Sequence, residues 1–184
     1  GEQFDIVILA DGALDNLAAQ GKVEAGSRVD LARSMIGMSV RKGTPKPDIS
    51  TVDALRQTLL DAKSVAYSAS ASGTYLANEL FPRLGVAEQM KGKATRILSE
   101  RVGAVVLRGD ADIGFQQVSE LLPFKELEFV GPLPDEVQQR VFFSAGVATG
   151  AKSPDTARHL IRFLAAPAAA PIVRSTGMEP AAKP

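Results

Sequence analysis

The chain has 184 residues, of which 45% are hydrophobic and 23% are charged, a composition typical of a protein with an apolar core. Lysine plus arginine and aspartate plus glutamate both number 21, so the formal charge is zero, and no basic cluster indicates a nucleic-acid partner. The absence of cysteine excludes a disulfide framework and a thiolate metal site. The apolar runs are much shorter than the roughly 20 residues that a membrane-spanning helix needs.

Strand and helix patterns alternate along the chain. Short apolar runs predict strands at residues 5–10, 35–41, 64–67, 94–98, 112–115, 128–130 and 141–148. Apolar residues at helical spacing predict helices after residue 12, at 50–60, 71–84, 100–108 and 154–165, and before 177. This alternation predicts an α/β fold with parallel sheets, and the run at 5–10 predicts a strand buried on both faces.

The run SASASGTY, from Ser68 to Tyr75, closes one predicted strand and opens the next helix. The first turn of a helix has unpaired N–H groups and the positive end of the helix dipole. Small residues let a ligand approach these amides, and hydroxyl groups add donors, so the run suits an anion. The alternative is an ordinary helix cap, because Ser, Thr and Gly are preferred at that position.

Several segments, in the right order, resemble the periplasmic solute-binding proteins of ABC transporters with the type II fold, and most closely their molybdate-binding branch. They read FDIVILAD at 4–11, SGTYLA at 72–77, ERVGAV at 100–105, ADIG at 111–114, and the closing stretch from 153 to 177. The resemblance covers nearly the whole chain. It implies two lobes with parallel or mixed sheets flanked by helices, which a hinge closes around a ligand.

The resemblance also implies bounds, partners and a location. The first lobe is expected from residues 1–37 and 149–184, and the second lobe from 38–148. The family's opening strand, helix and strand would precede residue 4, so we expect a truncated first lobe and a possible homodimer that covers it. The family implies a periplasmic protein, although residues 1–10 contain no secretory signal. It would deliver a small anion to a membrane permease, perform no chemistry and need no cofactor or metal.

The family's contacts, carried over by position, assign the ligand site of the second lobe to Ser70, Ser72, Gly73, Arg101 and Gln117. The family offers a backbone amide, usually of valine, where this chain has Arg101, and a tyrosine hydroxyl where it has Gln116 or Gln117. A guanidinium has a planar fork that suits a carboxylate, so a small organic anion is favoured over molybdate, with a molybdate-like oxyanion as the alternative. Gln117 is preferred to Gln116 because neighbouring strand residues point to opposite faces. The alternative for Arg101 is a solvated position at a helix start.

Other function classes have less support in the residues. His159 is the only histidine, so a zinc site would otherwise need carboxylates alone. Ser39 and Lys42 have the S-x-x-K spacing of acyl-serine enzymes, but they fall in a predicted strand and would not share a helical turn. No phosphate-binding loop or dinucleotide motif is present. A ligand-sensing or catalytic protein on the same two-lobe fold is the alternative, because a fold does not fix a function.

Overall fold

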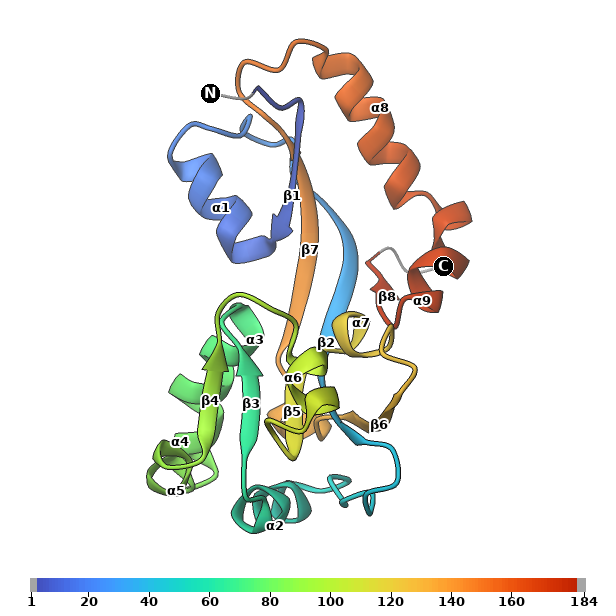
Figure 1. Cartoon of the computed structure of the whole chain (residues 1–184). Coiled ribbons are helices and arrows are strands. Elements are labelled where there is room, and N and C mark those ends of the chain that lie inside the picture. The colour runs from blue at the N-terminus through green and yellow to red at the C-terminus, as the bar shows by residue number, and fades with distance from the viewer. Residues whose placement is uncertain (1–2, 182–184) are drawn as a thin grey trace. The chain divides into compact units, whose positions relative to one another are not determined.

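The structure is a computed structural model that describes residues 3–181 (Figure 1). The chain forms two compact units. Unit 1 consists of residues 1–34 and 140–184, and unit 2 consists of residues 35–139. The strand β2 (Val29–Arg41) begins in unit 1 and ends in unit 2.

Unit 1 is built on a sheet in the order β1–β7–β2. The strand β1 (Ile6–Ala10) is antiparallel to β7 (Arg140–Val147), and the short β8 (Glu179–Pro180) pairs with the first half of β2. Its helices are α1 (Asp11–Ala19), α8 (Pro154–Ala165) and α9 (Ala170–Ser175), with a 3-10 turn at Pro167–Ala169. Buried side chains of β7 and α8, such as Val147 and Ile161, form its core.

The prediction that the run at 5–10 is buried on both faces of a parallel sheet is wrong. The run does form β1, but β1 is antiparallel to β7 and lies at the end of the sheet order. Ile8 is 47% exposed. An apolar run reports hydrophobicity but not its partner, and an antiparallel sheet can leave one face in water.

Unit 2 contains a mixed sheet in the order β2–β5–β3–β4, with β6 (Leu127–Pro132) paired to β2. The strand β3 (Val65–Ser68) is parallel to β4 (Ala94–Ile97) and to β5 (Ile113–Gln117), whereas β2 is antiparallel to β5. This arrangement confirms the predicted α/β class. The helical segments are α2 (Val52–Asp61), α3 (Ala71–Tyr75), a π-helical stretch (Leu76–Leu80), α4 (Phe81–Arg83), α5 (Ala87–Lys91), α6 (Val102–Arg108), α7 (Val118–Leu121) and a 3-10 turn (Asp135–Val137).

The compact units do not have the bounds expected for the lobes. Residues 35–37 are expected in the first lobe but lie in unit 2, and residues 140–148 are expected in the second lobe but lie in unit 1. The second difference has a structural cause, because residues 143–147 of β7 pair with β1, for example Gly146 with Val7. The lobe bounds themselves stay a prediction.

The parallel strands of unit 2 bring the starts of α3, α6 and α7 to one edge of the sheet. Tyr67 of β3 lies opposite Arg96 of β4 and Phe115 of β5. Along the chain, β3 leads into α3, β4 into α6 and β5 into α7, and in Figure 1 the arrowheads of β3 and β4 point toward α3. Open α/β sheets bind ligands outside the carboxyl ends of their parallel strands. We call this region the strand-end edge.

Candidate functional site

The hydroxyl groups of Ser68, Ser70 and Ser72 meet at the strand-end edge. Ser68 Oγ lies 2.7 Å from Ser70 Oγ and 2.9 Å from Ser72 Oγ, and the oxygens of Ser70 and Ser72 are 3.2 Å apart. Ser68 and Ser72 are buried, whereas Ser70 is exposed. Hydroxyl protons rotate to suit their partners, so these groups can turn toward an acceptor that enters. We call this cluster the serine triangle.

The residues that precede α3, α6 and α7 are Ser70, Arg101 and Gln117, which are the N-caps of these helices. Within the described chain, none of these side chains caps its own helix through a hydrogen bond. The first amides of each helix have no acceptor inside the helix. The structure therefore brings three of the expected site residues to equivalent positions on one edge, where backbone donors also gather.

Gly73 allows α3 to lie directly against the end of β3. A Cβ atom at this position would lie 1.6 Å from the carbonyl oxygen of Ser68 and 2.9 Å from Cδ2 of Tyr67. No side chain fits in that space, so the close approach that forms the serine triangle depends on glycine. Gly73 is buried and has no side chain, so its backbone N–H is the donor that it can offer.

Arg101 forms an ion pair with Glu120 in the first turn of α7. Arg101 Nε lies 3.2 Å from Glu120 Oε2, and the two side chains are 57% and 41% exposed. The guanidinium is thus solvated, as the alternative from sequence allows, but it also holds a carboxylate. Glu120 occupies the kind of position that the carboxylate of a ligand would take.

Gln116 and Gln117 are both buried, but they lie near the starts of different helices. Gln116 Oε1 accepts a hydrogen bond of 3.0 Å from the amide of Val102 at the start of α6. The amide next to Arg101 is therefore already paired within the protein. Gln117 ends β5 and precedes α7, so Gln117, and not Gln116, is the glutamine at the helix start that follows β5.

The sequence did not single out two further residues at this edge. Ser68, the last residue of β3, completes the serine triangle. Arg96 Nη2 donates to the carbonyl oxygen of Ala69 at 3.1 Å, on the backbone between Ser68 and Ser70. Ser68 stood in the serine-rich run and could have been found there. Arg96 could not, because its position depends on the pairing of β4 with β3.

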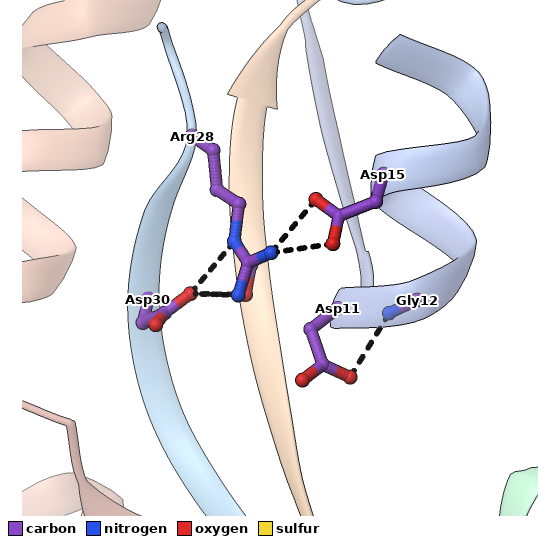
Figure 2. A network of polar contacts seen from close by, with 6 residues as sticks. Asp11, Gly12, Asp15, Arg28 and Asp30 are labelled. Atoms are coloured by element: carbon purple, nitrogen blue, oxygen red, sulfur yellow. Dashed lines mark hydrogen bonds and ion pairs between the residues drawn. The ribbon is translucent and has the colours of Figure 1, made fainter. Parts of the chain in front are cut away.

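Unit 1 contains a separate polar network around Arg28 (Figure 2). Arg28 Nη1 donates to both carboxylate oxygens of Asp15 at 2.7 Å, and Arg28 Nε donates to Asp30 Oδ1 at 3.0 Å. Ser144 Oγ on β7 also donates to Asp30 Oδ1, at 2.6 Å. Asp11, at the start of α1, accepts a hydrogen bond of 3.0 Å from the next amide in the chain.

These contacts shift the titration of the network. Partial burial raises the pKa of Asp30, but the hydrogen bonds from Ser144 and Arg28 outweigh it, so the pKa lies below its ordinary value. The hydrogen bonds to Asp15 and Asp30 raise the pKa of Arg28. Arg28 therefore stays charged and matched by two carboxylates, and the network links α1 to β2 and β7.

His159 and a metal site are further candidates that the sequence raises. His159 is exposed on α8. Among residues 3–181, no group of three or more histidines and carboxylates could hold a metal ion. Over the same residues, none of the helices has the length and apolar character needed to cross a bilayer.

A family model described as bacterial extracellular solute-binding protein matches residues 1–179. The chain belongs to this family. Two solved structures have the same fold: the substrate-binding domain of a putative molybdenum ABC transporter from Clostridium difficile, and the periplasmic molybdate-binding protein of Azotobacter vinelandii. The first has a TM-score of 0.75 and 19% identity, over 97% of this chain and 78% of the other. The second has a TM-score of 0.74 and 18% identity, over 100% of this chain and 80% of the other. The expected likeness to the molybdate-binding branch is confirmed at the level of the fold.

A curated relative of this solute-binding protein is named for a reaction. Aconitate isomerase from Pseudomonas sp is 46% identical over 179 residues, which are 97% of this chain and 68% of the relative. An isomerase is an enzyme. The expectation that this solute-binding protein performs no chemistry is therefore wrong, and the catalytic alternative has the better support.

Proposed function

We propose that this solute-binding protein is an isomerase that acts on aconitate, or on a small tricarboxylic acid of the same kind, bound at the strand-end edge of unit 2. The observation that carries the proposal is the 46% identity to aconitate isomerase over 97% of the chain. The molybdate-binding structures, at 18% and 19% identity, bear on the fold alone. The ligand is then an organic anion and not molybdate.

The donors at the strand-end edge suit such an anion. Aconitate has three carboxylates on an unsaturated carbon chain. One carboxylate would accept hydrogen bonds from Ser70, Ser72 and the first amides of α3, including that of Gly73. A second would bind the fork of Arg101 and displace the carboxylate of Glu120 from it. The amide of Gln117 would donate to a remaining ligand oxygen.

The chemistry requires a group that moves a proton. In an unsaturated acid of this kind, the CH₂ group between the double bond and a carboxylate is acidic. A base would remove one proton, the electron pair would spread over the allylic carbons and the carboxylate, and the proton would return after rotation or at the other allylic carbon. The double bond then changes its geometry or its position while atoms and charge balance.

Glu120 is our candidate for the base. It lies in the first turn of α7, and its present partner is Arg101 at 3.2 Å. A ligand carboxylate that takes over Arg101 would leave Glu120 beside a negative charge and without its cation. Glu120 would then be a carboxylate released from its ion pair and next to the ligand, where it could accept a proton.

The family also indicates where the protein acts and which membrane protein it would contact. The family consists of extracellular solute-binding proteins, so we propose a periplasmic location for this chain. The same family background makes an ABC permease its candidate membrane partner. An isomerase in that position would convert its ligand before or during capture for uptake.

Proton NMR on the purified protein with a single isomer of aconitate tests the proposal. We expect the vinyl proton signal of the second isomer to grow with the wild-type protein and to grow at least tenfold more slowly with Ser72→Ala. Ser64→Ala is the matched control, because Ser64 Oγ accepts from the amide of Asp112 at 2.9 Å at the opposite end of β3. Saturable binding with no second isomer would overturn the isomerase proposal.

A further inference from the structure

Arg96 stands on the strand next to the serine triangle. Its Cα is paired with that of Tyr67, one residue before Ser68. Arg96 Nη2 donates to the carbonyl oxygen of Ala69 at 3.1 Å. Ala69 separates Ser68 from Ser70 in the chain, so this hydrogen bond ties the guanidinium to the backbone segment that carries both serines.

Arg96 differs in its partners from two other arginines of unit 2. Arg101 is paired with Glu120, and Arg108 is paired with Glu100 and Asp110. Within residues 3–181, Arg96 has no ion pair, and its residue is exposed. A guanidinium carries five N–H donors, so the bond to Ala69 leaves several for another acceptor.

A full positive charge changes what the serine triangle can bind. Neutral hydroxyls and amides alone suit an oxyanion, whereas an adjacent guanidinium offers a bidentate contact to a carboxylate. Coulomb attraction also grows with the charge of the ligand. We propose that Arg96 is a specificity-determining residue that binds a ligand carboxylate beside the serine triangle and favours polycarboxylates over singly charged acids. This inference rests on the proposed function, because it takes the ligand to be a polycarboxylate.

Arg96 could have a purely structural role, in which it only donates a hydrogen bond to the carbonyl of Ala69 and does not contact a ligand. Arg96→Gln removes the charge but keeps a polar side chain, and ligands of different charge then separate the two roles. Arg56→Gln is the matched control: Arg56 Nε donates to the carbonyl oxygen of Leu84 at 3.1 Å and has a polar contact of the same type in the same unit. Arg96→Lys restores the charge without the fork.

Calorimetric titration with aconitate, fumarate and crotonate, which carry three, two and one carboxylates, tests the inference. We expect Arg96→Gln to weaken aconitate binding about tenfold or more and crotonate binding much less, since a charge-assisted bond is lost. Arg96→Lys should recover part of the affinity, and Arg56→Gln should stay within twofold of the wild type. The melting temperatures, measured without ligand, should not separate Arg96→Gln from Arg56→Gln.

The possible failures are distinguishable. If the wild-type protein binds aconitate and Arg96→Gln binds it equally well, Arg96 has no part in the site. The same conclusion follows if Arg96→Gln weakens all three acids by the same factor, because the effect would then not depend on ligand charge. A wild-type protein that binds none of the acids overturns the proposed function, and the polycarboxylate assignment fails with it.

Discussion

At the scale of single residues, Gly73 is a position where one added atom should disturb both folding and binding. A Cβ there would lie 1.6 Å from the carbonyl oxygen of Ser68. We expect Gly73→Ala to lower the free energy of unfolding by about 1–3 kcal/mol, the usual cost of overpacking, and to weaken aconitate binding. Gly92→Ala is the control, because no atom lies within 4 Å of its Cβ position. Urea unfolding curves that coincide for the two variants would contradict this account.

Substitutions of the two partners in the ion pair, Arg101 and Glu120, should affect binding and turnover differently. Arg101→Gln should weaken aconitate binding roughly ten- to a hundredfold, because a charge-assisted hydrogen bond to the ligand is lost. Glu120→Gln should bind aconitate at least as tightly as the wild type, since the competing carboxylate is gone, but should lose turnover. Calorimetry and NMR on the same samples separate the two effects. Wild-type turnover by Glu120→Gln would remove Glu120 from the mechanism.

At the scale of elements, the start of α6 depends on a side chain from β5. Gln116 Oε1 accepts from the Val102 amide at 3.0 Å in a buried position. Gln116→Met keeps the length of the side chain but leaves that amide without an acceptor, which should cost about 1–3 kcal/mol of unfolding free energy. Gln57→Met, which removes an exposed contact to Asp61 within α2, is the control and should cost much less. The prediction fails if both variants unfold at the same urea concentration.

The elements that local signals define were predictable. Thr51, at the start of the helix predicted at 50–60, caps α2, and its Oγ1 accepts from the Ala54 amide at 3.1 Å. The first half of β2 was not predictable, because Asp30 and Arg33 interrupt its apolar pattern. Their partners, Ser144 and Glu179, lie more than 100 residues away in the chain. The four-residue helix α7 is too short to give a periodic signal.

In the candidate site, too, some positions follow from local sequence signals and others depend on residues distant in the chain. Ser70, Arg101 and Gln117 lie two or three residues after the ends of predicted strands, so their positions at one edge follow once those strands are parallel. The contacts of Arg96 with Ala69 and of Gln116 with Val102 depend on strand order and register instead. Neither is encoded by local spacing, and so the sequence could not indicate them.

At the scale of the whole molecule, the Arg28 network makes part of the stability depend on pH. The pKa of Asp30 is lowered in the folded protein, so its contribution is present above the unfolded value of about 3.9 and is lost as the pH falls through the lower folded value. Asp30→Asn should be less stable than the wild type at pH 7, and the difference should shrink below about pH 4. Asp61→Asn, on the exposed surface of α2, is the control. A difference that stays constant from pH 7 to pH 3 would contradict the assignment.

The expected homodimer stays a prediction. β1 lies at the end of the sheet order, and Phe4 and Ile8 are 59% and 47% exposed. An edge strand of this kind can pair with its copy in antiparallel fashion around a two-fold axis. Light scattering should therefore give a mass that falls toward the monomer on dilution, and Ile8→Lys should shift the protein to monomer at all concentrations. A wild-type monomer at micromolar concentration would refute the prediction.

A crystal structure of the protein with aconitate would show directly whether the acid binds at the strand-end edge. We expect one carboxylate of the ligand within hydrogen-bonding distance of the hydroxyls of Ser70 and Ser72, with Arg101 and Arg96 bound to ligand carboxylates. Glu120 should have left Arg101. Aconitate bound away from the strand-end edge, with the pair between Arg101 and Glu120 intact, would contradict the account.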